Sequence, residues 1–289
     1  MKVLVTGASG QLGAYLLDRL GETGRAAIGW SGSQAGRRGN SEVVPVDLAD
    51  AGATEAALEA ADPGAVIHAA ALSTAEAVRL DPARARTVNV EATGRIAAWC
   101  ARRGRRLIFT STDLVFGGSG PWNSEADPAE PALAYGRSKR EAEPAVLGVA
   151  GGVVARLPLL YGPSRCARPY FFTRATEALA RGEPQTFFED EYRTPLDLAT
   201  AARALVRLAD SELTGLYHVA GAERVSRYGL MRRAAVALGL DPALVRPNRR
   251  ADVTLAEPRP ADVSLDSAKL AAAWPDFRWP TIEEALAIL

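Results

Sequence analysis

A phenol and an ammonium group lie four residues apart in the segment Tyr135-Gly136-Arg137-Ser138-Lys139. In a helix the side chains of Tyr135 and Lys139 would project from one face, one turn apart. A nearby ammonium favours the phenolate and lowers the pKa of a tyrosine from its ordinary value of about 10. Such a phenol can pass a proton to or from a carbonyl or alcohol oxygen. The motif is weak by itself, but its chemistry is that of the acid in a hydride-transfer site.

A glycine-rich turn near the N-terminus predicts a site for a dinucleotide. The apolar segment 2–6 is followed by Gly7, Gly10 and Gly13, and leucines then recur at helical spacing. A strand, a glycine turn and a helix form the first half of a dinucleotide-binding βαβ unit, in which the helix N-terminus offers N–H groups to the phosphates. The spacing here is Gly-x-x-Gly-x-x-Gly and not Gly-x-Gly-x-x-Gly. The alternative is a glycine-rich turn that binds no ligand. We expect the cofactor to contact Gly7, Ser9, Gly10, Gln11, Leu12 and Gly13.

The composition argues against several classes of protein. Among 289 residues, Lys+Arg and Asp+Glu both number 34, so no net charge favours nucleic acid or a membrane surface. No apolar run reaches the ~18 residues of a membrane span, and the N-terminal apolar segment is too short for a signal peptide. Cys100 and Cys166 fit a reducing compartment, so we expect a cytoplasmic protein. His68 and His218 lie in apolar strand-like segments, so we expect no metal site there.

Strand-like and helix-like segments alternate along the first half of the chain, which predicts an α/β fold with a Rossmann-type doubly wound parallel sheet. Ligands of such sheets bind beyond the carboxyl ends of the strands. Strands are expected at 2–6, 26–30, 42–46, 65–69, 106–111 and 152–157, and helices at 11–21, 54–61, 81–103 and 135–147.

The second half of the chain is expected to form a smaller lobe that binds the substrate. After about residue 157 prolines become frequent and strand-like segments become short. We therefore assign residues 1–157, plus roughly 194–220, to a cofactor-binding Rossmann domain. Residues 158–193 and 221–289 form the smaller, interwoven C-terminal lobe.

Four motifs follow one another at suitable intervals: Gly7-x-x-Gly10-x-x-Gly13, His68-Ala69-Ala70-Ala71, Ser111-Thr112-Asp113 and Tyr135-x-x-x-Lys139. With them the chain resembles the extended short-chain dehydrogenases/reductases. The segment Ser-Thr-Asp-Leu-Val-Phe-Gly-Gly, with the later Tyr-Gly-x-Ser-Lys, is similar to the dTDP-4-dehydrorhamnose reductase branch. The resemblance implies that Tyr135 donates a proton and that Thr112 hydrogen-bonds the carbonyl oxygen. It also implies that Lys139 tunes Tyr135 and holds the nicotinamide ribose, and Tyr135 is expected, like Lys139, to contact the cofactor.

The resemblance also implies further contacts with the ligands. Asn89 would begin a helix that faces the site, and its alternative is a residue that bonds only backbone groups. Ser111 is the alternative to Thr112 if the register shifts by one residue. The remaining expected contacts are Asp47 and Leu48 beside the adenine, Ala69, Ala70 and Ala71 beside the cofactor, and Asp113 beside the substrate.

The segment after the second strand favours NADP over NAD. An NAD site usually has an Asp or Glu there for the ribose. Here the strand runs into Ser31, and the first acid that follows is Glu42. Arg37 and Arg38 lie in the same loop and could pair with a 2′-phosphate, the alternative being a solvated basic loop. We predict NADP as the cofactor, with Ser31, Arg37 and Arg38 as contacts, and NAD as the alternative.

Two arginines of the second half suit the diphosphate of a nucleotide. Arg193 and Arg259 fall near positions where the resembling proteins hold such a group, and guanidinium binds it bidentately. The alternative for each is a surface or inter-lobe salt bridge. The reductases carry Arg-Thr-Ser-Trp after the sixth strand, with the tryptophan against the sugar, but here Leu159 takes that place. This version is similar to the regulatory β subunit of methionine adenosyltransferase, a relative that binds NADP and acts through a partner protein.

Three functions stay open. The motifs favour an NADP-dependent reductase of a keto sugar, most naturally a nucleotide-linked one. A sugar dehydrogenase, epimerase or dehydratase is second, although a dehydratase usually has Asp-Glu after the catalytic threonine where this chain has Asp113-Leu114. A cofactor-binding regulatory subunit is third. We expect a small-molecule sugar or nucleotide sugar as the partner, neither nucleic acid nor membrane, and leave open a homodimer.

Overall fold

The computed structural model describes residues 2–167, 170–254 and 256–288, and the chain divides into two compact units. The first unit comprises Met1–Thr112, Ala134–Arg156 and Ala202–Tyr217, and the second comprises Asp113–Leu133, Leu157–Ala201 and His218–Leu289. The sequence analysis had placed residues 113–133 and 194–201 with the Rossmann domain. They belong to the second unit because Val115 and Phe116 pack on Val263 and Leu265, and Leu196 pairs with Leu160.

An eight-stranded sheet forms the centre of the first unit, in the order β12-β7-β6-β5-β1-β2-β4-β3. The pairs β1–β2, β1–β5, β2–β4 and β5–β6 are parallel, as the alternation of elements predicted. The edge strand β3 is antiparallel to β4 and was not predicted, because its Gly-Arg-Arg sequence has no apolar pattern. The strands are β1 Val3–Thr6, β2 Ala27–Ser31, β3 Gly36–Arg38, β4 Ser41–Pro45, β5 Ala65–His68, β6 Arg106–Thr112, β7 Gly152–Leu157 and β12 Gly215–His218.

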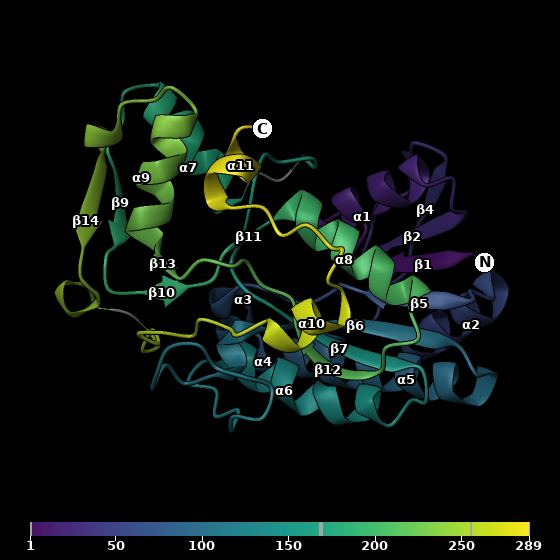
Figure 1. Cartoon of the computed structure of the whole chain (residues 1–289). Helices are drawn as coiled ribbons and strands as arrows, with labels where there is room; N and C mark the ends of the chain where they lie inside the picture. The colour runs from purple at the N-terminus through teal and green to yellow at the C-terminus, as the bar shows by residue number, and fades with distance from the viewer. Residues whose placement is uncertain (1, 168–169, 255, 289) are drawn as a thin grey trace. The chain divides into compact units, whose positions relative to one another are not determined.

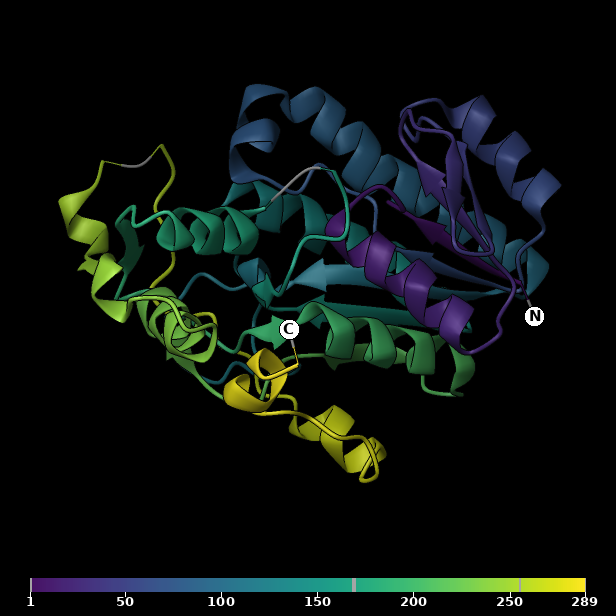
Figure 2. The same cartoon turned by 90° about the horizontal axis from the view of Figure 1, so that it is seen from above.

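Helices cover both faces of this sheet. Figure 2 shows α1 and α8 on one face and α2, α5 and α6 on the other. Their bounds are α1 Gln11–Glu22, α2 Ala51–Ala61, α3 Ala75–Leu80, α4 Pro82–Arg86, α5 Ala92–Arg103, α6 Ala134–Leu147 and α8 Leu198–Asp210. The layers confirm the predicted Rossmann-type doubly wound fold. None of the helices in the described ranges is long and apolar enough to cross a membrane.

The helix expected at 81–103 is not continuous. Asp81 caps the start of α4 by accepting a hydrogen bond from the Arg84 backbone N–H (2.9 Å), with Pro82 at the first helical position. A π-helical turn, η1 (Thr87–Glu91), then joins α4 to α5. Such turns are rare in proteins overall, and those that occur are often found at functional sites.

The second unit is built from short elements. Its two-stranded pairs are β10–β13, β11–β8 and β14–β9, and the helices α7, α9 and α11 surround an apolar core that includes Phe172, Leu230 and Ile282 (Figure 1). Leu159, at the position where the reductases carry tryptophan, packs against this core. The elements are β8 Leu160–Tyr161, α7 Phe171–Ala180, β9 Gln185–Phe188, β10 Tyr192–Arg193, β11 Leu196–Asp197, β13 Val225–Ser226, α9 Arg227–Ala237, β14 Val245–Asn248, α10 Ala268–Ala273 and α11 Ile282–Leu286.

Both histidines are buried, as the apolar segments around them predicted. His68 in β5 hydrogen-bonds Thr6 (2.7 Å) and Thr93 (3.0 Å) through its two ring nitrogens. Burial, with the charge of Lys139 as the second cause, lowers the pKa of His68 to about 3, so the ring is neutral at neutral pH. The backbone N–H of His218 donates to the Glu125 carboxylate (2.8 Å), and its ring meets Phe116 edge-on.

Candidate active site

The glycine turn after β1 brings three backbone segments of the first unit close together. Gly7 has φ of +72°, and a Cβ atom there would lie 2.9 Å from the backbone N and Cα of Ala70. A Cβ on Gly13 would lie 2.1 Å from the carbonyl oxygen of Gly7. Both positions therefore require glycine, so the turn can lie against the loop after β5 and the start of α1.

The start of α1 suits an anionic group. Gly10 is the N-cap residue of α1. Because glycine has no side chain, no N-cap side chain accepts a hydrogen bond from the N–H groups of the first helical turn. The first turn also carries no acidic residue. N–H groups at a helix N-terminus attract phosphate. Ser9 is exposed, and Gln11, Leu12 and the loop residues Ala69, Ala70 and Ala71 are partly exposed.

The two expected adenine contacts differ in their surroundings. The side chain of Asp47 is half exposed and accepts a hydrogen bond from the Ala49 backbone N–H (3.0 Å). The side chain of Leu48 is buried in the apolar core, and its carbonyl accepts a hydrogen bond from Arg95 (2.7 Å). The structure thus gives Leu48 a packing role, and the contact of either residue with adenine stays a prediction.

In the basic loop predicted to bind a 2′-phosphate, Arg38 forms an ion pair within the protein and Arg37 is exposed to solvent. Arg38 donates two hydrogen bonds to the Asp18 carboxylate (2.7 and 2.8 Å) and a third to the carbonyl of Ala14 (3.0 Å). Arg37 is exposed and donates to the carbonyl of Asn40 (3.2 Å). The hydroxyl of Ser31 accepts from the Gln34 backbone N–H (2.8 Å). Of the three predicted contacts, Arg37 is therefore the exposed one, and the contact of each with a 2′-phosphate stays a prediction.

Helix α6 places the tyrosine–lysine pair against β6, the strand that ends at Thr112. Tyr135 lies in the first turn of α6 and is partly exposed, and Lys139 follows one turn later. The Lys139 side chain is 1% exposed, and its Nζ atom lies 4.1 Å from the ring centroid of Phe109 in β6. Burial lowers the pKa of Lys139 to about 7, although the charge of Glu143 acts in the opposite direction. The predicted catalytic residues thus come from a neighbouring helix and strand of one unit.

A buried ion pair that the sequence analysis missed ties this helix to the sheet. Glu143, one turn beyond Lys139, accepts two hydrogen bonds from Arg156 in β7, both 2.9 Å. The Ser111 hydroxyl donates to the same carboxylate (2.7 Å). Both charged side chains are almost fully buried, so the pair anchors α6 to β6 and β7. Ser111 therefore has a structural partner, and Thr112, the next residue, stays the predicted catalytic hydroxyl.

Asn89 links the loop after β5 to helix α6. Its side chain accepts a hydrogen bond from the Leu72 backbone N–H (2.8 Å) and donates to the Leu72 carbonyl (3.1 Å) and to the Ser138 hydroxyl (3.0 Å). The alternative, that Asn89 bonds only backbone groups, is therefore wrong. The π-helical turn directs this side chain inward, next to the residue that precedes Lys139.

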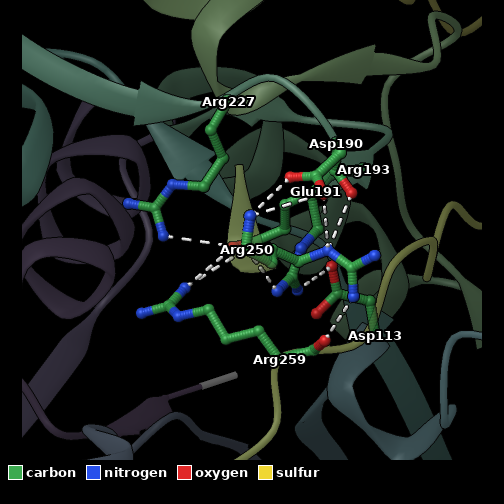
Figure 3. A network of polar contacts seen from close by, with 7 residues as sticks. All are labelled: Asp113, Asp190, Glu191, Arg193, Arg227, Arg250 and Arg259. Atoms are coloured by element: carbon green, nitrogen blue, oxygen red, sulfur yellow. Dashed lines mark hydrogen bonds and ion pairs between the residues drawn. The ribbon is translucent and has the colours of Figure 1, made fainter. Parts of the chain in front are cut away.

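The second unit holds both predicted arginines in one charged network, which we call the arginine cluster: Arg193, Arg227 and Arg259 with Glu191 and Asp113 (Figure 3). Arg193 donates to Asp113 (2.8 Å) and Glu191 (3.0 Å), and its side chain is 6% exposed. Arg259 also donates to Glu191 (3.0 Å). Arg193 is thus a buried residue, and its two carboxylate partners in the described ranges belong to its own unit. Glu191 and Arg227 were missed, although Glu191 stands two residues before Arg193.

The fold and the site together define an extended short-chain dehydrogenase/reductase. A parallel sheet, a glycine turn after its first strand, and a Tyr-x-x-x-Lys helix beside the strand that ends in threonine are the defining features. The chain belongs to the RmlD substrate binding domain family, whose model matches residues 1–288.

Individual relatives carry two kinds of name. The chain is 32% identical over 281 residues to a dTDP-4-dehydrorhamnose reductase of Mycobacterium tuberculosis, covering 94% of this chain and 86% of that protein. It is 30% identical over 276 residues to methionine adenosyltransferase 2 subunit beta of Pongo abelii, covering 93% and 81%. The crystal structure of a hypothetical dTDP-4-dehydrorhamnose reductase from Sulfolobus tokodaii is 27% identical, with a TM-score of 0.84 and coverage of 98% and 99%.

Proposed function

We propose that this chain is an NADPH-dependent reductase of a keto group on a nucleotide-linked sugar. The observation that carries the proposal is the placement of Thr112, Tyr135 and Lys139 on adjacent elements, β6 and α6, of the unit that also bears the glycine turn. The reductase names of the Mycobacterium and Sulfolobus relatives support the same reaction. In this proposal the first unit binds the cofactor and the second binds the nucleotide sugar.

The side chains divide the chemistry among them. The glycine turn Gly7–Gly13 would hold NADPH, which would supply the hydride that the carbonyl carbon accepts. Tyr135 donates a proton to the carbonyl oxygen as negative charge develops there. Thr112 donates a hydrogen bond to the same oxygen. Lys139 provides a positive charge that stabilises the phenolate and a donor for the ribose hydroxyls. Asn89 and Glu143 fix the position of α6, the helix that carries Tyr135 and Lys139.

The cofactor assignment predicts that Arg37 accounts for a preference for NADPH. Arg37→Ala should weaken NADPH binding about 10- to 150-fold, because a charge-assisted hydrogen bond to the 2′-phosphate is lost. NADH binding should be unchanged. Arg38→Ala should cost less, because Asp18 already holds that guanidinium, and the double variant should erase most of the preference. Calorimetric titration with both cofactors measures this, and a wild-type protein that binds NADH more tightly would contradict it.

The substrate assignment predicts that Arg259 acts on the nucleotide sugar. Arg259→Ala should raise KM for a nucleotide sugar about tenfold or more, with NADPH affinity unchanged, because a guanidinium contact to the diphosphate is lost. Arg193→Ala should raise KM for the nucleotide sugar further. Because this change also leaves Asp113 and Glu191 without their main partner, the thermal stability of the variant must be measured together with its kinetics.

Arg249→Ala is the matched control for Arg259→Ala. Arg249 is paired with Glu189, outside the arginine cluster, and its side chain is 70% exposed. If free sugars are reduced as well as nucleotide sugars, and Arg259→Ala changes nothing, the diphosphate assignment is wrong.

A regulatory subunit is the second candidate function. The observation that favours it is the 30% identity to methionine adenosyltransferase 2 subunit beta, together with Leu159 at the tryptophan position. The discriminating experiment incubates the purified protein with NADPH and a panel of 4-keto nucleotide sugars, and in parallel uses it to capture a partner. Turnover supports the reductase. Cofactor binding without turnover of any keto sugar, together with a stoichiometric enzyme partner, supports the regulatory subunit.

A cytoplasmic location and a homodimer belong to the same proposal. Within the described residues neither Cys100 nor Cys166 forms a disulfide, which is what a reducing compartment favours. Light scattering of the purified chain tests the homodimer.

A further inference from the structure

Glu191 lies at the centre of the arginine cluster. Its side chain is 0% exposed, and its two oxygens face three guanidinium groups: those of Arg193 at 3.0 Å, Arg259 at 3.0 Å and Arg227 at 3.8 Å (Figure 3). Burial alone would raise the pKa of Glu191, but the three arginine charges outweigh burial and hold the pKa below its ordinary value. The carboxylate is therefore charged near neutral pH and serves as the shared counter-anion of the cluster.

The cluster still carries an excess of positive charge. The three arginines contribute +3, and Glu191 and Asp113 contribute −2, so the net charge is +1. Arg250 and Asp190, at the border of the cluster, pair with each other and leave this sum unchanged. One further negative charge would neutralise the cluster.

Arg227 is the arginine whose partners are least complete. It forms an ion pair with Glu191 at 3.8 Å and lies over the ring of Phe171, but within residues 2–167, 170–254 and 256–288 no group accepts a hydrogen bond from its guanidinium. Its side chain is 18% exposed, and that of Arg259 is 36% exposed. An incoming anion can therefore meet Arg227 and Arg259, while Glu191 and Arg193 lie deeper.

We propose that Glu191 is an internal competitor of the substrate's anion, which limits the affinity of Arg227 and Arg259 for a diphosphate. The proposal rests on the proposed function in that it takes the diphosphate of a nucleotide sugar as the ligand, and it adds Arg227 to the residues that bind it. In the free protein Glu191 keeps three like charges close together. When a diphosphate binds, it shares these guanidinium groups with a carboxylate that repels it.

The sign of the effect distinguishes competition from support. If Glu191 competes, removal of its charge strengthens diphosphate binding, because unit charges several Å apart interact by more than the free energy of a tenfold change in affinity at the effective dielectric constant of a protein site. If Glu191 only holds the arginines in position, removal of its charge lets them separate and weakens binding.

The test measures the binding of inorganic pyrophosphate by calorimetry, with NADP present in excess to occupy the glycine turn. Glu191→Gln keeps the shape of the side chain and should bind pyrophosphate at least about tenfold more tightly than wild type. Glu189→Gln, the same change at a partly exposed carboxylate paired with Arg249, should leave the affinity unchanged. Adding Arg227→Met to Glu191→Gln should remove the gain. Equal or weaker binding by Glu191→Gln would overturn the proposal.

A second variant keeps the proposal testable if Glu191→Gln does not fold. Arg227→Met alone should lower pyrophosphate affinity about tenfold, because one of the two more exposed guanidinium groups of the cluster is lost. Unchanged affinity would refute its role. These readouts need no turnover, so a gain in pyrophosphate binding without keto-sugar reduction would refute the proposed function and leave this inference standing.

Discussion

Tyr135→Phe is expected to lower kcat for keto-sugar reduction by about 10²- to 10⁴-fold, the usual contribution of a general acid. The variant removes only the hydroxyl, and the ring stays in the first turn of α6. NADPH binding should survive, because the glycine turn and Lys139 are untouched. Steady-state kinetics at saturating NADPH measure the loss, and calorimetry measures the binding.

Two further variants complete this comparison. Tyr228→Phe removes a hydroxyl from α9 of the second unit and should leave kcat unchanged. Lys139→Met should lose activity and part of the cofactor affinity together, because the lysine serves the phenol and the ribose. An unchanged kcat in Tyr135→Phe would show that another group donates the proton.

Gly10→Val is expected to abolish binding of the dinucleotide while the fold is retained. The Gly10 backbone has φ of −87° and ψ of 170°, an extended conformation that valine adopts readily. A Cβ atom there would lie 3.2 Å from the Gly7 carbonyl oxygen, a tight contact that a shift of a few tenths of an ångström would relieve. The branched side chain would instead fill the space at the helix N-terminus where a pyrophosphate binds.

The control for this prediction lies on the same helix. Gly21→Val, in the last turn of α1, places its side chain in open space and should leave cofactor affinity unchanged. Circular dichroism of both variants checks the fold. Cofactor affinity in Gly10→Val equal to that of wild type would refute the assignment of the glycine turn.

The sheet and the glycine turn could be predicted because their signals are local. Buried parallel strands have short, continuous apolar sequences, and the spacing of the glycines identifies the turn. The strand β3 could not be predicted, since Gly36-Arg37-Arg38 pairs only because β4 offers a free edge. The packing of the segment 113–133 against Val263 and Leu265 could not be predicted either, because the residues that meet are far apart in the chain.

The charged partners of the site were harder to predict than its catalytic residues. Tyr135 and Lys139 stand one helical turn apart, so their spacing is visible in the chain. Glu143 meets Arg156 and Glu191 meets Arg259 only after distant elements have packed, and the sequence gives no sign of which charge finds which partner. The roles predicted for Thr112, Tyr135, Lys139 and the cofactor loop stay predictions until a ligand is bound.

The π-helical turn at Thr87–Glu91 restricts insertions and deletions in this segment of the chain. Such a turn contains one residue more than an α-helical turn, so the side chains on its two sides are out of phase by about 100°. Removing one residue here would restore a regular helix and rotate Asn89 relative to α5, away from Ser138. In this segment a change of length would therefore be more damaging than most changes of residue type. Chains that keep the link between Asn89 and α6 must keep the extra residue as well.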